Sequence, residues 1–387
     1  MKKILFAHGI FPGGGAERVT IDIAKYLTLC NSDYKCYVCT PEIVEDLCTE
    51  EVKNCLTIIE VSQDNDQRSK EIENFVMSEG INLIIQVVQP IKNIKEICQK
   101  AGCKSIFANH GEPMWQRHSI IRHRKRSVVY GPLWKLLWRR YYVDKGHARR
   151  IAFGRVKHHY HDCDVYTVLC NDYKVETCND YGITPEESKI VVIENSEQIV
   201  PNVTYDKEKI ILFCGRLEVT SKRPDRLLRI WGKVQHRLPD YRLVIVGDGP
   251  YRQAMEKQIV NEGLERVDMV GRHSNVEPYY RKASIVCLTS TTEGWPLCMT
   301  EAQAHGCIPV AFGCTSGVKD ILSPSGVNGF IVTPFDEEEY AQTLLHIAAM
   351  SEEERSKIRH SAVEKRAKYT PEVIMQKWKD LIDSLID

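Results

Sequence analysis

Short apolar runs alternate with amphipathic stretches along the whole chain, and this rhythm predicts the fold class. The segment 16–29 has the spacing of apolar residues that is typical of a helix with one buried face. Similar helical patterns separate most of the apolar runs, as in βαβ units. The pattern therefore predicts an α/β chain built on doubly wound parallel sheets. In the first half, the runs expected to form strands are 2–8, 34–40, 56–61, 82–88, 104–110, 165–171 and 189–195.

A polar link at 200–209 interrupts this rhythm, which then restarts. Two Rossmann-like domains are therefore expected, one over 1–200 and one over 201–370. A chain of 387 residues is long enough for two such cores. The tail from 371 to 385 has a helical pattern of its own. In the second half, the runs expected to form strands are 210–214, 241–246, 267–271, 285–290, 308–312 and 329–333.

The composition indicates a reduced intracellular enzyme. The 15 cysteines lie mostly in apolar runs, so we expect them to be core residues rather than disulfides. No apolar run approaches the roughly 18 residues needed to span a membrane. The first run ends at His8 and Gly9, which suits a strand better than a signal peptide. We therefore expect the protein to act in the cytoplasm.

The stretch 290–306 holds the strongest candidate for a ligand site. It reads Ser-Thr-Thr-Glu-Gly-Trp-Pro-Leu-Cys-Met-Thr-Glu-Ala-Gln-Ala-His-Gly and follows an apolar run. Pro296 suits the first turn of a helix, so we expect Glu293 in the preceding loop and Glu301 about 7 Å further along the helix axis. The free N–H groups at such a helix start attract anions. Two carboxylates that flank an anion site suit a nucleotide sugar, which has a diphosphate in the middle and hydroxyls at both ends.

This stretch resembles the retaining glycosyltransferases of family 4, which have the GT-B fold. The likeness rests on Glu293 and Glu301 as an E-x7-E pair within Glu-Gly-Trp-Pro-Leu. The resemblance implies two Rossmann-like domains that face a cleft, with the nucleotide sugar held by the second. It also implies that the last helix, 371–387, crosses back to complete the first domain. No cofactor is implied, and no bound metal is expected because the GT-B fold typically needs none.

A glycine-rich loop, 13–17, follows the first predicted strand. Gly14 and Gly15 would let backbone N–H groups approach a phosphate or a sugar closely. The loop does not match the dinucleotide fingerprint, and the second strand closes on Thr40 rather than an acid, so a dehydrogenase is disfavoured. In family 4, a Gly-Gly-x-Glu loop in this place borders the donor phosphates and the acceptor. A plain flexible turn is the alternative.

Two cations, Arg216 and Lys222, follow the first strand of the second domain in Cys-Gly-Arg-Leu…Lys. Open α/β folds bind ligands at this carboxyl edge of the sheet. The pair resembles the Gly-Arg-Leu…Lys signature of the family, whose cations hold the diphosphate and offset the charge of the leaving group. Arg223 is an alternative for Lys222, and a surface salt bridge is the alternative for the pair.

The same resemblance marks two further residues near strand ends. His110, in Asn-His-Gly-Glu, resembles the histidine that family members place over the donor sugar. His8 is a competitor for that role, and a structural histidine is the alternative. Arg272, in Gly-Arg-His, lies where the family places the nucleotide base. The turn Val-Gly-Asp-Gly-Pro at 246–250 is interpreted mainly as structural.

The segment 111–160 interrupts the pattern and carries an unusual charge. Between 115 and 157 it holds thirteen Lys or Arg and a single acid, Asp144, so it is +12 in a chain of zero net charge. Aromatic residues are interleaved, with Trp134 and Trp138 spaced for one helix face. Cations beside aromatic rings suit an anionic membrane surface or a lipid-linked acceptor. A locally packed hairpin and a nucleic-acid surface are the alternatives, of which nucleic acid is not expected.

The resemblance implies a retaining glycosyltransferase that moves a sugar from a UDP- or GDP-linked donor to a hydroxyl of a glycan or lipid-linked acceptor in cell-surface glycan synthesis. Such an enzyme would work in the cytoplasm, in peripheral contact with the inner face of the membrane. Two other functions stay open, a sugar-nucleotide epimerase and a non-catalytic nucleotide-sugar sensor. The residues expected in catalysis are Glu293, His110, Arg216 and Lys222. Those expected to bind the donor are Gly14, Gly15, Arg216, Lys222, Arg272, Glu293, Gly294, Trp295, Pro296, Leu297 and Glu301.

Overall fold

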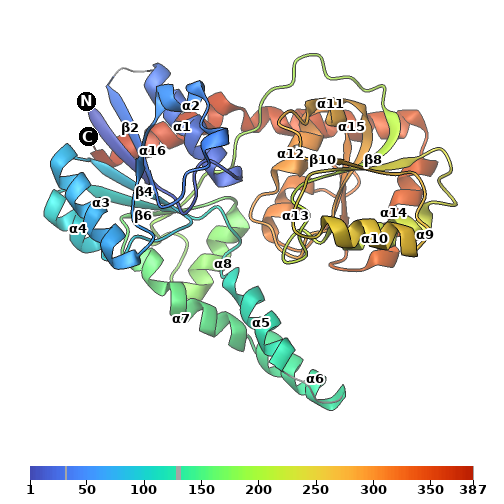
Figure 1. Cartoon of the computed structure of the whole chain (residues 1–387), viewed down its shortest axis with the longest axis horizontal. Coiled ribbons are helices and arrows are strands. Elements are labelled where there is room, and N and C mark those ends of the chain that lie inside the picture. The colour runs from blue at the N-terminus through green and yellow to red at the C-terminus, as the bar shows by residue number, and fades with distance from the viewer. Residues whose placement is uncertain (31–32, 128–131, 387) are drawn as a thin grey trace. The chain divides into compact units, whose positions relative to one another are not determined.

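Two compact units make up the chain (Figure 1). The computed structural model describes residues 1–30, 33–127 and 132–386, without the side chains of residues 30, 122–127 and 132–135. The first unit comprises Met1–Glu194 and Ile374–Asp387, and the second comprises Asn195–Val373. The division lies a few residues before the one expected at residue 200.

A seven-stranded sheet forms the centre of the first unit, in the order β3-β2-β1-β4-β5-β6-β7. Every neighbouring pair of strands runs parallel. The strand order reverses between β1 and β4, so the sheet is doubly wound, and the prediction is confirmed. The strands are β1 (Lys2–Ala7), β2 (Tyr34–Thr40), β3 (Thr57–Glu60), β4 (Leu83–Val87), β5 (Lys104–Ala108), β6 (Val165–Val168) and β7 (Ile190–Val192).

Helices connect these strands, and the last helix of the chain packs on the first unit. Lys2 Nζ pairs with Asp383 Oδ1 at 2.8 Å, and Tyr26 Oη donates to Gln376 Oε1 at 2.9 Å. Besides the short 3-10 turn Glu45–Leu47, the helices that contribute to this unit are α1 (Gly15–Cys30), α2 (Glu50–Cys55), α3 (Asn65–Glu79), α4 (Ile94–Ala101), α5 (Gln116–Ser127), α6 (Pro132–Arg139), α7 (His147–His161), α8 (Asn171–Tyr181) and α16 (Pro371–Ile386).

The basic insert between β5 and β6 consists of α5, α6, a π-helical turn at Arg140–Asp144, and α7. Its base has a small apolar core in which Met114 and Ile120 meet Ala148 and Ala152. The insert is therefore packed at its base, as the hairpin alternative proposes. Trp134 and the cations at 122–126 and 135 lie outside the described side chains. The helix expected to carry Trp134 and Trp138 is α6, which gives way to the π-helical turn after Arg139.

A six-stranded parallel sheet forms the second unit, in the order β10-β9-β8-β11-β12-β13. This sheet is also doubly wound, as predicted. The strands are β8 (Glu208–Cys214), β9 (Arg242–Val246), β10 (Val267–Gly271), β11 (Ala283–Leu288), β12 (Ile308–Phe312) and β13 (Phe330–Val332). The helices are α9 (Pro224–Val234), α10 (Arg252–Asn261), α11 (Glu277–Lys282), α12 (Leu297–Ala304), α13 (Ser316–Leu322), α14 (Glu337–Ala349) and α15 (Glu352–Arg366), and a 3-10 turn spans Ala367–Tyr369.

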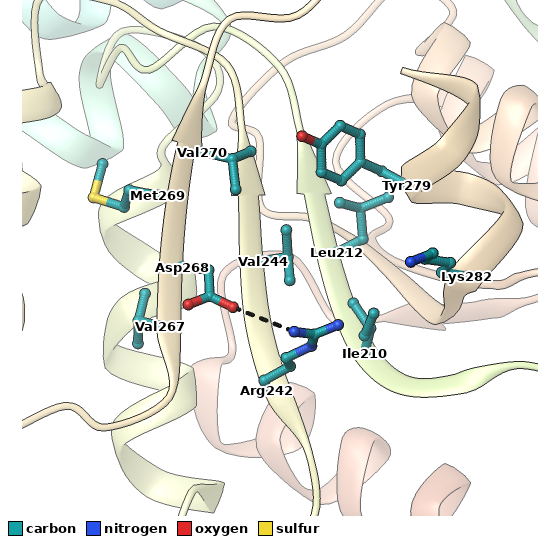
Figure 2. Close-up of a pocket in the computed structure, with 10 residues that line it drawn as sticks. All are labelled: Ile210, Leu212, Arg242, Val244, Val267, Asp268, Met269, Val270, Tyr279 and Lys282. Carbon is teal, nitrogen blue, oxygen red and sulfur yellow. Dashed lines mark ion pairs between the residues drawn. The ribbon is translucent and has the colours of Figure 1, made fainter. Parts of the chain in front are cut away.

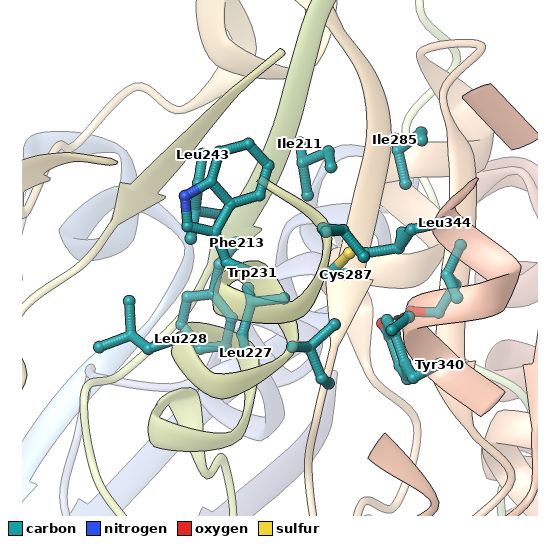
Figure 3. Close-up of a cluster of buried hydrophobic side chains, with 14 of the residues drawn as sticks. Ile211, Phe213, Leu227, Leu228, Trp231, Leu243, Ile285, Cys287, Tyr340 and Leu344 are labelled. Atoms are coloured by element: carbon teal, nitrogen blue, oxygen red, sulfur yellow. Dashed lines mark hydrogen bonds between the residues drawn. The ribbon is translucent and has the colours of Figure 1, made fainter. Parts of the chain in front are cut away.

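The core of the second unit lies between one face of this sheet and helices α9 and α14 (Figure 3). Trp231 is fully buried there, and its indole N–H donates to the carbonyl of Glu265 at 2.9 Å. Tyr340 connects two neighbouring strands, because its hydroxyl donates to the Val310 carbonyl at 2.6 Å and accepts from the Leu288 amide at 3.2 Å. This hydroxyl therefore holds the end of β11, from which the loop at 289–296 starts.

We predict that Tyr340→Phe lowers the free energy of unfolding by about 1–3 kcal/mol, because it leaves a buried carbonyl and a buried amide without their shared partner. Urea unfolding followed by far-UV circular dichroism measures this change. Tyr279→Phe is the matched control, since the Tyr279 hydroxyl bonds to His273 in an exposed pair. Equal unfolding midpoints for Tyr340→Phe and the wild type would contradict the assignment.

Candidate functional site

One buried carboxylate, Glu218, shapes the loop that follows β8. It accepts backbone N–H groups from Thr220 at 2.6 Å and from Ser221 and Lys222 at 3.0 Å each. The Ser221 hydroxyl donates to it as well. Burial raises the pKa of Glu218, but these hydrogen bonds outweigh burial and hold the pKa below its ordinary value. The ionised carboxylate thereby fixes the backbone from which Lys222 extends.

The loop after β11 is tied to the loop after β8. The Thr291 amide donates to the Ser221 carbonyl at 2.6 Å, and the Thr289 hydroxyl donates to the Arg223 carbonyl at 2.9 Å. The Arg226 guanidinium donates a hydrogen bond to the Thr289 carbonyl at 3.0 Å. The two loops meet because β8 and β11 are parallel neighbours, so their carboxyl ends lie at the same edge of the sheet.

An ion pair between Lys222 and Glu293 joins the two loops through their side chains. Lys222 Nζ lies 2.7 Å and 3.0 Å from the two carboxylate oxygens of Glu293, and the Ser290 hydroxyl donates to the same carboxylate at 2.6 Å. Burial lowers the pKa of Lys222, but the charge of Glu293 outweighs burial and raises it overall. Arg216 is exposed next to this pair, and no hydrogen bond or ion pair engages its guanidinium within the described chain.

The second candidate carboxylate, Glu301, is held by a buried tyrosine. Tyr280 is 1% exposed, and its hydroxyl donates to Glu301 Oε2 at 2.7 Å. Cys298, on the same helix, lies close enough to sense the charges of Lys222, Glu293 and Glu301. Burial is the main cause that raises the pKa of this thiol. The structure thus gathers both carboxylates and Lys222 around the first turns of α12, where Pro296 stands one residue before the helix as its N-cap.

Lys207 fixes the far ends of the two helices that supply this part of the site. Its ammonium donates to the carbonyls of Tyr280 at 3.1 Å, Arg281 at 2.9 Å and His305 at 2.7 Å. These carbonyls end α11 and α12, where a cation is favourable. Burial lowers the pKa of Lys207. Gly306 follows with φ of +68°, the left-handed geometry that stops α12.

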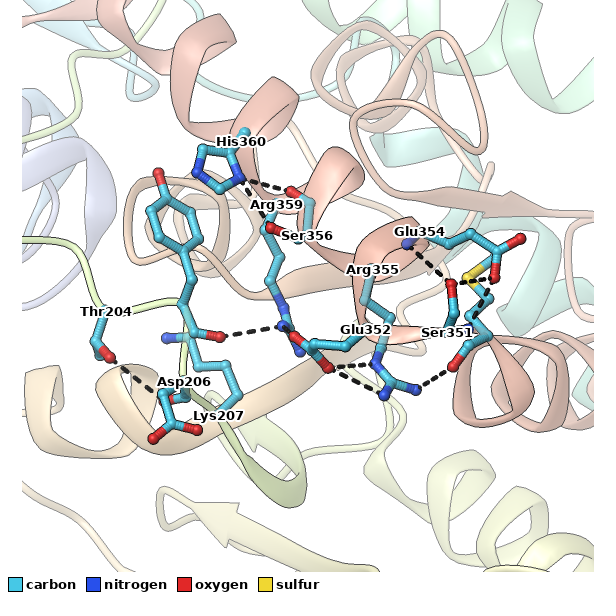
Figure 4. A network of polar contacts seen from close by, with 12 residues as sticks. Thr204, Asp206, Lys207, Ser351, Glu352, Glu354, Arg355, Ser356, Arg359 and His360 are labelled. Carbon is cyan, nitrogen blue, oxygen red and sulfur yellow. Dashed lines mark hydrogen bonds and ion pairs between the residues drawn. The ribbon is translucent and has the colours of Figure 1, made fainter.

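Figure 4 shows that the segment around Lys207 is itself fastened to α15. Arg359 is 2% exposed and donates to the Tyr205 carbonyl at 3.1 Å and to Glu352. Arg355 donates to the same carboxylate at 3.0 Å. The polar link ahead of β8 therefore connects α15, through Tyr205 and Lys207, to the end of α12.

Three further contacts anchor the other end of α12. The Thr300 hydroxyl donates to the buried carboxylate of Glu197 at 2.6 Å. The backbone amide of Glu197 in turn donates to the Tyr369 carbonyl at 2.8 Å. Trp295 is 5% exposed and packs with its ring centroid 6.0 Å from that of Tyr369. Trp295 and the first half of α12 are thus held by residues near both ends of the second unit.

The turn at 246–250 has the geometry of a structural element. Gly247 has φ of +138°, and a Cβ atom there would lie 1.9 Å from the Gly215 carbonyl oxygen. The Leu217 amide donates to the Asp248 carbonyl at 2.9 Å, so the turn supports the loop that carries Arg216. Arg272 follows β10 directly and is exposed.

The remaining predicted residues belong to the first unit. Gly14 precedes and Gly15 begins α1, directly after the loop that follows β1. His8 is buried, 2.9 Å from the Thr20 hydroxyl and 3.7 Å from Glu17 Oε1. β5 ends at Ala108, so His110 lies in the following loop rather than in the strand.

Within the described ranges, no group of three or more His, Cys, Asp or Glu could hold a metal ion. Asp64 and Asp66 have Asp-x-Asp spacing, but Asp64 caps the start of α3 and Asp66 pairs with Lys92. Cys36 and Cys39 have Cys-x2-Cys spacing, but three positions along β2 place them on opposite faces of the sheet. The expectation that no metal takes part stays a prediction.

A cavity of 480 Å³ lies on the second sheet (Figure 2), and its lining includes none of the site residues predicted from the sequence. Ile210, Leu212 and Val244 form its apolar floor, and Arg242 faces Asp268 across it at 3.8 Å. The cavity runs along strands β8 to β10 instead of opening at their carboxyl ends. The position of the Lys222–Glu293 pair fits the usual ligand edge of an open α/β sheet better.

Comparison with known proteins shows what the chain is similar to. Residues 194–365 match the family model described as "Glycosyl transferases group 1". The chain is 30% identical over 191 residues to the amylovoran biosynthesis glycosyltransferase AmsD of Erwinia amylovora, covering 49% of this chain and 52% of that protein. It is 28% identical over 266 residues to an α-1,4-N-acetyl-D-galactosaminyltransferase of Campylobacter jejuni, covering 68% of this chain and 67% of that protein.

Solved structures match over the whole chain. Anabaena HepE in complex with UDP-glucose is 18% identical with a TM-score of 0.75, and each chain is covered completely. The apo form of the lipopolysaccharide outer core galactosyltransferase WaaB is 17% identical with a TM-score of 0.68, with 99% of each chain covered. The predicted GT-B fold is thereby confirmed.

Sequence reasoning found the charged residues but missed those that hold them, namely Glu218, Tyr280, Lys207 and Glu197. A signal for Glu218 is present in the sequence, because an acid two residues ahead of Thr-Ser in a loop can accept the backbone N–H groups that follow it. The partners of Lys207 are far away in sequence, and no local pattern indicates them.

We predict that Glu218→Gln lowers the free energy of unfolding by about 1–3 kcal/mol at pH 7, because one amide oxygen cannot replace a carboxylate that accepts several N–H groups. The native pKa is lowered, so the contribution is present above the ordinary value of about 4.3 and is lost as the pH falls through the native pKa. Urea unfolding at several pH values measures the difference between the variant and the wild type. Glu262→Gln, an exposed change, is the control. A difference that is constant down to pH 3 would refute the role of the ionised carboxylate.

Proposed function

Because the chain belongs, through residues 194–365, to the glycosyl transferases group 1 family, we propose that it is a retaining glycosyltransferase. It moves a sugar from a nucleoside-diphosphate sugar to an acceptor hydroxyl. The observation that carries this proposal is the Lys222–Glu293 pair beside exposed Arg216 at the carboxyl edge of the second sheet.

Lys222 and Arg216 bind the donor diphosphate in this proposal. The guanidinium of Arg216 has no competing partner within the described chain, and the raised pKa of Lys222 keeps that ammonium charged. Negative charge develops on the diphosphate as the glycosidic bond breaks, and fixed cations stabilise that charge. The diphosphate takes the place of Glu293 beside Lys222. The carboxylate of Glu293 can then bind the sugar hydroxyls.

Glu301 binds the ribose hydroxyls of the donor. Tyr280 holds one oxygen of this carboxylate in place, so the side chain is oriented before the ligand arrives. The backbone N–H groups of Gly294 and Trp295, ahead of α12, lie next to the sugar and diphosphate. Pro296 and Leu297 shape this turn. Arg272 lies near the base in this proposal, and the roles expected for Gly14, Gly15 and His110 of the first unit stay predictions.

The nucleotide is a uridine or guanosine diphosphate, and similarity to HepE, solved with UDP-glucose, favours uridine as the first candidate. The Campylobacter relative is named for an acceptor linked to undecaprenol through a diphosphate, and AmsD is named for amylovoran biosynthesis. These names support a lipid-linked or polysaccharide precursor as the acceptor. The enzyme works in the cytoplasm without a metal or another cofactor.

The outer part of the basic insert supports contact with an anionic membrane surface. No described helix is long and apolar enough to cross a bilayer. Leu136 and Leu137 are 63% and 47% exposed, and Tyr141 and Val143 are also exposed. Exposed cations accompany them at Arg139, Arg140 and Lys145. Apolar side chains among cations are the pattern that binds at a lipid interface, close to a lipid-linked acceptor.

We predict that Glu301→Ala weakens donor binding about 10- to 150-fold, the equivalent of roughly 1.5–3 kcal/mol for a lost hydrogen bond to a charged group. Arg216→Ala should instead lower turnover by on the order of 10²–10³. Calorimetric titration with a panel of UDP- and GDP-sugars measures the first, and nucleotide release in the presence of an acceptor lipid extract measures the second. Glu262→Ala and Arg237→Ala, both exposed in the same unit, are the matched controls.

The same assay separates the rival functions. An epimerase converts the donor without an acceptor, and a sensor binds the donor without forming product. A retaining transferase needs the acceptor and forms a product with the anomeric configuration of the donor, which NMR determines. Normal donor affinity in Glu301→Ala together with normal turnover in Arg216→Ala would remove both residues from the site.

We predict that changing Arg139, Arg140 and Lys145 to Gln weakens binding to anionic vesicles by up to about two orders of magnitude at low salt, at roughly 1 kcal/mol per cation. Co-sedimentation with vesicles that contain phosphatidylglycerol measures the effect. The control variant changes three other exposed cations, Lys70, Lys95 and Lys257, to Gln. Donor affinity should be unchanged in both variants. Equal sedimentation of the two variants, or none by the wild type, would leave the insert as a packed hairpin.

A further inference from the structure

Two cysteines face each other across the end of α4. The helix stops at Gly102, which has φ of +67°, and the Cys103 amide donates to the Cys98 carbonyl at 3.1 Å. This six-to-one bond is the mark of a Schellman motif, in which the side chains at the two bonded positions usually touch. Here both side chains are thiols, and the two sulfurs lie within hydrogen-bonding reach of each other.

The surroundings favour chemistry between these two sulfurs. Cys98 and Cys103 are each 7% exposed and line the same cavity of 340 Å³. A hydrogen bond from Cys98 lowers the pKa of Cys103 against the opposing effect of burial. The same hydrogen bond and burial raise the pKa of Cys98. Cys103 is therefore the sulfur that more readily becomes a thiolate, and Cys98 holds the proton beside it.

A third thiol in this cavity serves as an internal comparison. Cys163 also lines the cavity, but its thiol donates to the Tyr160 carbonyl at 3.4 Å. Burial raises its pKa to about 11. Cys163 is thus an inert structural thiol next to the pair.

We propose that Cys98 and Cys103 form an oxidisable dithiol that closes to an intrachain disulfide in the presence of a peroxide. The Cys103 thiolate attacks one oxygen of hydrogen peroxide, which breaks the O–O bond and gives a sulfenic acid and hydroxide. Cys98 then attacks that sulfur, the S–S bond forms, and the sulfenic oxygen leaves as water with the two remaining protons. In total, two thiols and one peroxide give one disulfide and two waters.

This modification site is independent of the proposed glycosyl transfer. The pair directly precedes β5, which begins at Lys104, whereas the candidate residue His110 follows the other end of that strand. The disulfide would join the last turn of α4 to the start of β5, and a thiol reductant would reopen it by exchange.

The sequence makes a direct test simple, because trypsin cleaves between the two cysteines. Cleavage after Lys95, Lys100 and Lys104 releases residues 96–100 and 101–104 as separate peptides with one cysteine each. The full chain is treated with hydrogen peroxide, alkylated, digested and analysed by mass spectrometry. Cys48, which is partly exposed, reports the reactivity of an ordinary thiol.

We expect more than half of the chains to yield the two peptides as one linked pair. This should occur at a peroxide dose at which more than half of Cys48 is still a free thiol that can be alkylated. Dithiothreitol should separate the pair, Cys98→Ser and Cys103→Ser should abolish it, and Cys163→Ser should leave it unchanged. The wild-type digest needs no variant, so the test stands even where a substitution impairs folding. Recovery of both peptides separately while Cys48 is oxidised would overturn the proposal, as would Cys103 sulfinic acid beside alkylated Cys98.

Discussion

The parallel pairing of β8 with β11 is the constraint on which the second unit depends. It sets Ile211 beside Ile285 and Leu212 beside Val286 in the buried centre of the sheet. Both strands therefore end at the same edge of the sheet, and the loops that follow them lie in contact. The bonds between these loops and the Lys222–Glu293 pair all follow from that one adjacency.

The Lys222–Glu293 ion pair at this edge suits an exchange in which a diphosphate replaces the carboxylate beside Lys222. Lys222 is only partly exposed, so its charge needs a partner, and Glu293 supplies it at 2.7 Å. A diphosphate brings more negative charge than one carboxylate and can also engage Arg216. The surrounding contacts hold this arrangement, since Glu218 fixes one loop and Tyr280 orients Glu301. Such a frame keeps the charged groups in place while the ligand changes, which is what electrostatic stabilisation of a leaving group requires.

The fold could be predicted from the sequence because its signals are local. Each parallel strand is a short apolar run, and β2, β10 and β12 begin and end where the pattern places them. The candidate charges at the carboxyl edge could be predicted for the same reason, since each follows such a run.

The supporting residues could not be predicted, because their partners are set by tertiary structure. Tyr280 and Glu301 are joined only when α11 and α12 lie side by side, and Lys207 reaches carbonyls that belong to both helices. The π-helical turn at Arg140–Asp144 also has no periodic signature. The sequence marks the end of α4 by Gly102, but only the folded backbone shows that Cys98 and Cys103 are joined by a hydrogen bond around this turn.

The most direct test of the central claim is a crystal structure of the protein with an intact nucleotide sugar. We expect diphosphate oxygens at about 3 Å from Lys222 Nζ and from the Arg216 guanidinium. The ribose hydroxyls should bind Glu301, and Glu293 should be released from Lys222. A nucleotide sugar bound elsewhere, with the Lys222–Glu293 contact still at 2.7 Å, would contradict the claim.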